Sequence, residues 1–307
     1  MKNTISSLIW AGLAAIILVL ISGFVFTFES FTALKSYGEE PSYKVYALEL
    51  PDTLNFAGEI VPLHSPDLRE RLDRELLVNT YWQSNMMLLL KRANKYFPTI
   101  EKILKEEGVP TDFKYLSVIE SGLENVISPV GAKGFWQIMR TTGREYGLEV
   151  NSNVDERYHL AFSTRLAAQY LKKAKDKFGS WTLAAASYNR GMSGIQRNLN
   201  AQKVESYFDL QLGKETSRYV FRILAVKEIM ENPSKYGYVF DDNDLYYSVP
   251  VRYHGLDTAI SNLTIFAKKM GVNHKVLKIH NPWLLQNHLN NKSRKYYQIA
   301  IPEKGHY

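Results

Sequence analysis

The hydrophobic pattern changes along the chain, beginning with an apolar run at the N-terminus. After Lys2 no charged residue occurs until Glu29, and residues 8–28 are almost continuously apolar. A helix of about 21 residues is roughly 30 Å long, which matches the hydrocarbon core of a bilayer. A secretory signal would have a shorter apolar run and a small-residue cleavage site, which we do not find. The pattern predicts an uncleaved transmembrane anchor over residues 1–28.

The residues after the apolar run predict an orientation and a spacer. A single lysine precedes the run and acidic residues follow it. This positive-inside bias places the bulk of the chain on the extracytoplasmic, periplasmic side. Residues 29–65 contain several prolines and no helical period, so we expect an extended linker with a short strand at Tyr43–Leu48. Fully stretched, about 37 residues could span roughly 120 Å.

Apolar residues recur with a helical period from residue 66 to about residue 238. Ser65 followed by Pro66 is typical of a helix start, and Leu68, Leu72 and Leu76 fall on one face. Further helical segments are expected at 86–97, 99–108, 110–121, 160–179, 181–189 and 216–230. The pattern predicts an all-helical domain of about 170 residues.

The pattern changes again after residue 238. LYYSVPVRY and YYQIAIP alternate as strands do, and the short helical segments NLTIFAKKMG and HKVLKIH lie between them. This order predicts a small α+β module over residues 239–307. The fold class is therefore mainly α, with an N-terminal transmembrane helix, an all-helical domain and a small α+β C-terminal module.

Charge is concentrated in the C-terminal module. The chain has a net charge of +7, and residues 251–307 hold nine Lys and Arg against two Asp and Glu, so this segment carries the whole excess. The excess indicates either an anionic partner or a solvated basic face. Because nucleic acid is scarce outside the cytoplasm, membrane phospholipid and cell-wall polymer are the better candidates, and no nucleic-acid partner is expected.

The residue types leave carboxylates as the candidate chemistry. The chain has no Cys, which excludes disulfides, a cysteine nucleophile and thiolate metal sites. His159 is the one histidine in the helical domain, so neither a metal site nor a Ser–His pair is expected there, and no cofactor. Glu120 ends an apolar helical run, where desolvation would raise its pKa and let it act as an acid. A solvated glutamate at a helix end is the alternative.

Three motifs occur in a fixed order within the helical domain. They are ESGLENVISPVGAKGFWQIMRTTGREYGL (120–148), AASYNRG (185–191) and KETSRYV (214–220). Together they resemble the signature of soluble-lytic-transglycosylase-type domains, which have a goose-lysozyme-like fold. VDERYH (154–159) and GEIVPL (58–63) make the chain most similar to the membrane-bound branch of lytic murein transglycosylases.

This resemblance implies a lysozyme-like all-helical catalytic domain over residues 66–238 and roles for six residues. Glu120 matches the family's single catalytic acid and base. The positions that match substrate-binding residues are Ser128, Gln137, Met139, Tyr188 and Glu215. Of these, Ser128 would contact the substrate's acetamido group, and the Tyr188 hydroxyl would point towards the cleaved bond.

The reaction that the resemblance implies is cleavage of the bond between N-acetylmuramic acid and N-acetylglucosamine in peptidoglycan. Glu120 would act first as acid and then as base, and the product would carry a 1,6-anhydromuramyl end. The substrate's own 2-acetamido group would replace the second carboxylate of ordinary glycosidases. Two alternatives stay open: a hydrolytic muramidase on the same fold, and a non-catalytic protein that binds peptidoglycan. A membrane-attached nucleic-acid binder would rest on charge alone.

The C-terminal module carries a second resemblance. NLTIFAKKMGVNHKVLKIHNPWL (262–284), between two strands, is similar to a divergent LysM, a small domain that binds N-acetylglucosamine chains. The usual Gly-Asp-Thr-Leu opening is here reduced to Gly255-Leu256-Asp257-Thr258. A glycan-binding module and a module that only packs against the helical domain are both compatible with this sequence.

Overall fold

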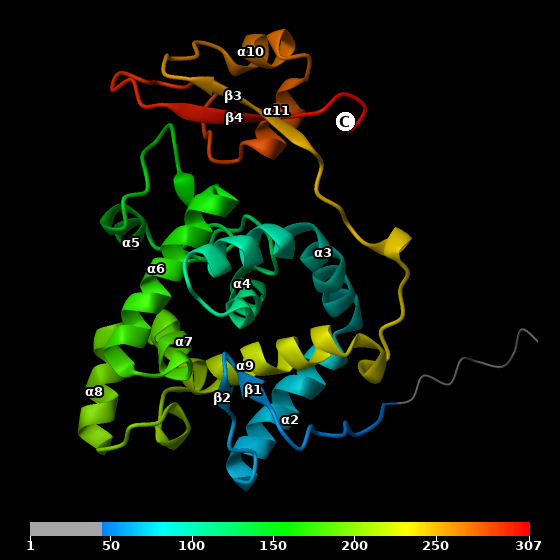
Figure 1. The fold of residues 1–307 in the computed structure, drawn as a ribbon, viewed down its shortest axis with the longest axis vertical. Helices are drawn as coiled ribbons and strands as arrows, with labels where there is room; N and C mark the ends of the chain where they lie inside the picture. Colours follow the sequence, from blue (N-terminus) through cyan, green and yellow to red (C-terminus); the bar gives the residue numbers. More distant parts are fainter. Residues whose placement is uncertain (1–44) are drawn as a thin grey trace, which may run out of the picture. The chain divides into compact units, whose positions relative to one another are not determined.

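The computed structural model describes residues 45–307, which form a mainly helical body followed by a small α+β module (Figure 1). Residues 48–307 make up one compact unit. The predicted transmembrane segment, residues 1–28, and the first part of the predicted linker, residues 29–44, lie outside the described residues. Within residues 45–307, no helix has both the length and the apolar character needed to span a bilayer.

Residues 54–63 of the predicted linker pack into the core, so the expectation of an extended spacer is wrong for this part of the chain. No strand forms over residues 45–48, and a hairpin of β1 (Asn55–Phe56) and β2 (Glu59–Ile60) follows instead. Its buried apolar side chains are Leu54, Phe56, Val61 and Leu63. Burial of these side chains stabilises the packed arrangement over a solvated one. The number of prolines in a segment does not indicate this burial.

Glu59 of β2 fastens this hairpin to α7 (Trp181–Arg190). Its carboxylate accepts hydrogen bonds from the backbone N–H of Trp181 at 2.5 Å and of Thr182 at 2.9 Å. The first N–H groups of a helix have no partner within the helix, and a negative charge is favourable there. Burial alone would raise the pKa of Glu59, but these bonds and those from the Thr182 and Ser180 hydroxyls lower it. The GEIVPL motif thus holds the start of the helix that carries Tyr188.

The two helices expected over residues 86–108 are one helix, α3 (Gln83–Glu106), with Pro98 inside it. A proline within a helix removes a hydrogen bond and costs about 3 kcal/mol. One buried face nevertheless runs on both sides of Pro98, formed by Met86, Leu89, Leu90, Ala93, Ile100, Ile103 and Leu104. The apolar contacts of this face offset the cost and keep the helix continuous. The preceding helix, α2 (Pro66–Thr80), begins at the predicted residue.

The other helical elements of the body follow in chain order, and Figure 1 labels the α-helices among them. They are η1 (Thr111–Phe113), α4 (Lys114–Ser121), α5 (Arg140–Glu145), η2 (Glu156–Tyr158), α6 (Leu160–Phe178), α8 (Met192–Gln202), η3 (Tyr207–Asp209), α9 (Lys214–Glu231), η4 (Pro233–Tyr236) and η5 (Asp242–Asp244). The sequence pattern did not predict α5 or α8. α4 packs against both α3 and α9, so its C-terminal turn lies within the body.

α9 is fixed to its neighbours by paired charges. The Arg218 guanidinium donates to both oxygens of the buried Glu75 on α2, at 2.6 and 3.1 Å. Further along the helix, Lys227 Nζ pairs with Asp112 Oδ2 of η1 at 2.6 Å. Bidentate pairs of this kind restrict both the position and the rotation of a helix. α9 therefore presents a defined face towards α4.

The C-terminal module has the predicted strand–helix–helix–strand order. β3 (Val251–Leu256) and β4 (Tyr297–Pro302) pair antiparallel, and α10 (Leu263–Lys269) and α11 (His274–His280) lie between them in the chain. The first strand begins later than LYYSVPVRY suggested. Pro250 precedes it, and a proline has no N–H to donate to a strand ladder.

The module is docked on residues 153–158 of the helical body. Val154 and Tyr158 belong to the same apolar cluster as the module's own core. The Asp155 N–H donates to the Trp283 carbonyl at 2.9 Å, and Lys295 Nζ pairs with the buried Glu156 at 2.6 Å. Shared apolar burial, backbone bonds and an ion pair together fix the module to the body.

Candidate active site

Glu120 lies in the last turn of α4, with its side chain turned towards α9. Tyr219 of α9 donates its hydroxyl proton to Glu120 Oε1. One turn further along α9, Arg222 donates to the Ile119 carbonyl at 3.1 Å. Glu120 is half-buried and Tyr219 is buried. The last turn of α4 and the middle of α9 are thus joined at the carboxyl group.

The environment of Glu120 gives it an unusual affinity for a proton. Burial raises its pKa to about 7. The Tyr219 hydrogen bond and the positive charge of Arg222 act against this rise, and the charge of Glu215 adds to it. A carboxyl group with a pKa near neutrality can hold a proton, donate it and take one back without a large free-energy cost in either direction. Glu120 therefore meets the requirement for an acid that later serves as a base.

Tyr188 lies near Glu120, on α7. Its hydroxyl donates to the Trp136 carbonyl at 2.8 Å, and its ring makes an edge contact with Tyr170. Burial and the charge of Glu120 raise its pKa, so the phenol stays protonated. The next residue, Asn189, accepts a hydrogen bond from the Thr216 hydroxyl at 2.8 Å and joins α7 to α9.

The three other predicted residues of the first motif lie on the loop between α4 and α5. Ser128 Oγ accepts the Ala132 N–H at 3.0 Å within a tight turn. Gln137 has a positive φ of 45°, and its side-chain amide donates to the Gly134 carbonyl at 2.8 Å. Met139 precedes α5 and is 41% exposed. Ser121, next to Glu120, donates to the Phe135 carbonyl at 2.9 Å and ties this loop to α4.

Arg157 of the VDERYH motif also holds this loop in position. Arg157 is buried, pairs with Asp155 at 2.7 Å and donates to the Ile138 carbonyl at 3.0 Å. Gly134 packs directly on it: a Cβ there would lie 2.2 Å from the Arg157 carbonyl oxygen. Because Asp155 also bonds to Trp283, this support continues into the C-terminal module.

Glu215 lies in the first turn of α9 and is exposed to solvent. Its side chain is 69% exposed and pairs with Arg222 at 3.3 Å. Among the described residues, Glu215 is the carboxylate whose charge raises the pKa of Glu120. The charge of Glu215 thus acts on Glu120, and the charge of Glu120 acts on Tyr188. Ser128, Gln137 and Met139 lie on the loop between α4 and α5.

Three residues that organise this site have no role predicted from the sequence. Tyr219 and Arg222 contact the last turn of α4, and Arg157 holds the loop. Tyr219 lies in the third motif and Arg157 in VDERYH, so the signal was present in the sequence. What the motifs do not give is the partner of each side chain, which depends on how α9 packs against α4.

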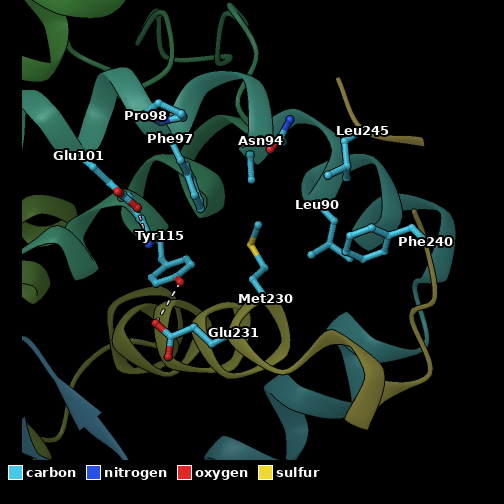
Figure 2. Close-up of a pocket in the computed structure, with 12 residues that line it drawn as sticks. Leu90, Asn94, Phe97, Pro98, Glu101, Tyr115, Met230, Glu231, Phe240 and Leu245 are labelled. Atoms are coloured by element: carbon cyan, nitrogen blue, oxygen red, sulfur yellow. Dashed lines mark hydrogen bonds and ion pairs between the residues drawn. The ribbon is translucent and has the colours of Figure 1, made fainter. Parts of the chain in front are cut away.

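A separate cavity of about 420 Å³ lies between α3, α4 and α9 (Figure 2). Figure 2 shows the Tyr115 hydroxyl directed at Glu231, to which it donates at 3.0 Å. Lys114 and Glu101 form a second pair in its wall, at 2.7 Å. Among the described residues that line this cavity, none is one of the six predicted site residues. Each of its three charged groups has a partner within the cavity wall: Lys114 pairs with Glu101, and Glu231 accepts the Tyr115 hydroxyl.

A helical body with one half-buried, proton-holding carboxyl at a helix end and a glycine-rich loop beside it defines a lysozyme-like class of domain. Residues 97–210 match the family model described as Transglycosylase SLT domain. Residues 252–305 match the model described as Soluble lytic transglycosylase C-terminal LysM-like domain. Both resemblances inferred from the sequence are thereby confirmed. Tyr219 and Glu215 lie just beyond the first matched range.

The relatives carry the same family names. Membrane-bound lytic murein transglycosylase D of Escherichia coli K12, and the same protein of Escherichia coli O6:H1, are 30% identical to this chain over 195 residues, which are 61% of this chain and 42% of each relative. The chain thus spans less than half the length of these curated relatives. A solved structure, an inactive mutant of the lytic transglycosylase Slt of Pseudomonas aeruginosa, is 22% identical, covers 49% of this chain and 26% of that one, and has a TM-score of 0.36.

Proposed function

We propose that the protein is a membrane-anchored peptidoglycan lytic transglycosylase. The observation that carries this proposal is the half-buried Glu120, with a pKa near 7 and a hydrogen bond from Tyr219. In this proposal residues 1–28 are the anchor, residues 66–238 form the catalytic domain and residues 239–307 form the LysM-like module. The family matches and the relatives' names support the substrate class.

In the first step Glu120 acts as the acid. Its protonated carboxyl donates to the glycosidic oxygen between N-acetylmuramic acid and N-acetylglucosamine, and the bond from muramyl C1 to that oxygen breaks. With a pKa of about 7, roughly half of the Glu120 side chains are protonated at neutral pH. Tyr219 fixes the orientation of the carboxyl, because its hydroxyl bonds to one of the two oxygens.

The positive charge that develops at C1 is stabilised by the substrate's own 2-acetamido oxygen, as in substrate-assisted glycoside cleavage. Ser128 and Gln137 would hold the sugar on the loop side. Ser128 Oγ already accepts the Ala132 N–H, so its own proton is directed elsewhere and can be donated to the acetamido group. Met139 and Tyr188 would line the cleft beside the reacting sugar.

In the last step the ionised Glu120 takes the proton from the muramyl 6-hydroxyl. That oxygen closes onto C1, gives the 1,6-anhydro end and regenerates the protonated carboxyl, so no water is consumed. Closure within one sugar replaces attack by a free water molecule. Glu215 would bind sugar rather than attack C1, because it is exposed and held by Arg222.

The location follows from the N-terminal pattern and from the relatives' printed description as membrane-bound. The anchor would hold the catalytic domain on the periplasmic side, where peptidoglycan lies. The basic C-terminal module would attract the anionic, peptide-bearing polymer. The partners are then peptidoglycan strands and the membrane.

The test is mass spectrometry of purified sacculi digested with the protein. A lytic transglycosylase releases anhydromuropeptides, which are lighter by one water than hydrolysis products. Glu120→Gln should release no product while binding sacculi within several-fold of the unsubstituted protein, and Glu106→Gln, a surface control paired with Arg165, should retain full turnover. Ser128→Ala and Tyr188→Phe should be slower but folded. Reducing-end products would indicate a muramidase, and sacculus binding without any soluble product would indicate a non-catalytic protein.

A further inference from the structure

In the described part of the chain, β3 and β4 form a two-stranded sheet, so each strand has one edge without a neighbouring strand (Figure 1). The outer edge of β4 is occupied by a side chain. Asn281, which is fully buried, accepts the Ala300 N–H at 2.8 Å and donates to the Ala300 carbonyl at 2.7 Å. This amide takes the place that the backbone of a third strand would have on that side.

The bonds at Ala300 also determine the direction of the backbone groups of β3. Residues that face each other across an antiparallel pair are alternately bonded and not bonded to each other. Ala300 uses its N–H and C=O on the outer side of β4, so it is not bonded to the residue opposite, Tyr253. The Glu303 N–H donates to the Pro250 carbonyl at 2.9 Å, which fits the same alternation. Tyr253 therefore directs its own N–H and C=O away from β4.

The same direction recurs at every second residue of β3. The outward N–H and C=O groups belong to Val251, Tyr253 and Gly255, and no backbone hydrogen bond within residues 45–307 involves them. Tyr253 is 62% exposed, Gly255 is also exposed and Val251 is half-buried. These three residues form a free strand edge on the module, which we call the β3 edge.

The β3 edge lacks the features that usually close the edge of a sheet. Free edges in soluble proteins generally carry lysines, prolines or a bulge, or lie under a helix or loop. β3 pairs with β4 over six consecutive residues without a bulge, and it contains neither lysine nor proline. Its one charged side chain, Arg252, donates to the Met270 carbonyl at 3.1 Å and so lies on the helix side of the sheet. The edge is therefore open to a further strand.

Two tyrosines provide ring surface beside the β3 edge. Tyr253 lies on the face of the sheet opposite to the buried Ile299 and Ile301. Tyr296, which is 65% exposed, lies over Gly255 on this same face, in the space that a side chain at Gly255 would need. Aromatic rings on one face of a sheet pack against the side chains of a neighbouring strand. An added strand would thus find backbone partners and apolar contacts together.

The charge around the β3 edge selects the kind of strand that fits. Residues 251–307 hold nine Lys and Arg against two Asp and Glu, and β3 itself has no acidic residue. Lys268 and Lys269, in the last turn of α10, are exposed and precede Met270, to which Arg252 is bonded. A second copy of this chain would bring the same positive excess to the edge and be repelled, whereas an acidic strand would be attracted.

We propose that the β3 edge binds an extended, acidic segment of a partner protein, which adds to the sheet as a third strand. The outward groups of Tyr253 and Gly255 would pair with the backbone of that segment, as in β-strand addition. Its carboxylates would face the basic residues of β3 and α10, and its apolar side chains would lie on the rings of Tyr253 and Tyr296. This inference does not depend on whether the helical body cleaves peptidoglycan.

The experiment is a titration of the full chain with three end-blocked peptides: ETVEVTE, its basic counterpart KTVKVTK, and ETVEVTE with N-methyl groups on its three central residues. N-methylation removes the peptide's own N–H donors and leaves its charge unchanged. Both the basic and the N-methylated peptide should bind at least tenfold more weakly than ETVEVTE. In hydrogen-exchange NMR, ETVEVTE should slow the exchange of the Tyr253 and Gly255 amides at least tenfold, and the His254 amide, already bonded to β4, should change little.

Two substitutions at one position separate the backbone from the ring. Tyr253→Pro removes the outward N–H and leaves the bonds between β3 and β4 in place, since proline is tolerated where the N–H of an edge strand faces solvent. It should weaken binding of ETVEVTE tenfold or more. Tyr253→Thr keeps the N–H and a strand-forming side chain, and should stay within threefold of the native protein.

Four results would overturn the proposal. The first is native affinity in Tyr253→Pro, with thermal unfolding showing that the variant is folded. The second is equal binding of the N-methylated and unmodified peptides, which would reduce the effect to charge alone; this comparison uses the native protein and stands even if Tyr253→Pro does not fold. The third is concentration-dependent dimerisation without peptide in analytical ultracentrifugation, abolished by Tyr253→Pro, which would assign the edge to a second copy. The fourth is displacement of ETVEVTE by N-acetylglucosamine tetramer, which would assign it to glycan.

Discussion

Tyr219 donates a hydrogen bond to the carboxyl of Glu120, although the two residues are separated by 99 positions in the chain. The bond stabilises the ionised carboxylate and so opposes the rise that burial causes in the pKa of Glu120. Tyr219 is thus a positioning residue that also adjusts the acid strength of the site.

Tyr219→Phe removes this bond with little change of shape. We expect the pKa of Glu120 to rise above its present value of about 7, so that the basic limb of the kcat/KM profile moves to higher pH. We also expect kcat to fall about tenfold, because a misplaced carboxyl transfers its proton less efficiently. A pH–rate profile on soluble glycan strands measures both effects. A lower rate with an unmoved basic limb would show that Tyr219 only maintains packing.

Glu215→Gln should move the basic limb of the kcat/KM profile to lower pH. The charge of Glu215 raises the pKa of Glu120, so its removal lowers that pKa, by a few tenths of a pH unit for a group this exposed. KM should rise if Glu215 also binds sugar. Glu205→Gln, at an exposed position outside the site, is the matched control and should alter neither value. A basic limb that moves upwards in Glu215→Gln would contradict the prediction.

The raised pKa of Glu120 also predicts a pH-dependent cost in stability. The folded state binds the proton more tightly than the unfolded chain, since the pKa rises from 4.5 to about 7 on folding. The resulting stabilisation is fully present below pH 4.5 and is lost as the pH rises through 7, at a cost of about 3 kcal/mol.

Glu120→Gln cannot ionise and should escape this loss. Urea unfolding of both proteins at pH 5 and pH 8 should show Glu120→Gln gaining about 2–3 kcal/mol on the native protein over that interval. The free energy of unfolding of Glu106→Gln should change between pH 5 and pH 8 as that of the native protein does. The prediction is wrong if the difference in free energy of unfolding between Glu120→Gln and the native protein is the same at pH 5 and at pH 8.

The glycines of the loop between α4 and α5 offer a matched pair of substitutions. Gly134 and Gly131 both have positive φ, 79° and 85°. A Cβ at Gly134 would lie 2.2 Å from the Arg157 carbonyl, whereas nothing lies within 4 Å of a Cβ at Gly131. Gly131→Ala should cost about 1 kcal/mol from backbone strain alone. Gly134→Ala should cost about 2–3 kcal/mol more and lower turnover, as measured by denaturant unfolding and sacculus digestion. Equal losses would show that the loop moves away from Arg157 freely.

Lys295 tests the attachment of the C-terminal module. Its ammonium pairs with Glu156, whose side chain is 5% exposed, and with Glu149 at 3.0 Å. Lys295→Met leaves the Glu156 carboxylate without this cation and should cost about 1–2 kcal/mol, less than for a fully buried pair because Lys295 is half-exposed. Limited proteolysis should cleave the Lys295→Met variant between body and module faster than it cleaves the native protein. Lys292→Met, an exposed neighbour, should behave as the native protein.

The helical body and the order of elements in the module were predictable because their patterns are local. Apolar periodicity and capping residues identified α2, α6 and α9, and the strand–helix–helix–strand order followed from alternation. α3 was divided wrongly at Pro98, because a local rule on proline does not include the buried face that continues past it. The hairpin at residues 55–60 was missed for the same reason: its burial depends on contacts with distant helices.

The site shows the same division between local and distant information. The three motifs predicted Glu120, Ser128 and Tyr188 as site residues, because motif residues can be matched one by one; the structure puts Tyr188 within the electrostatic reach of Glu120 and Ser128 on the loop after α4. The pKa of Glu120 was expected to rise through desolvation, and burial is its largest cause. The opposing contacts of Tyr219 and Arg222 depend on how α9 is rotated against α4, and the Glu75–Arg218 pair that fixes this rotation joins residues 143 positions apart.

The packed hairpin at residues 55–60 also bears on the reach that the proposed anchor would allow. If residues 1–28 anchor the protein, the segment between the anchor and the compact unit ends near Leu48, where that unit begins, and not at residue 65. Its greatest length is then roughly 65 Å, about half of what a free segment to residue 65 would allow. Under the proposed function, cleavage would then be confined to the layer of wall nearest the membrane, and strands farther out would be spared.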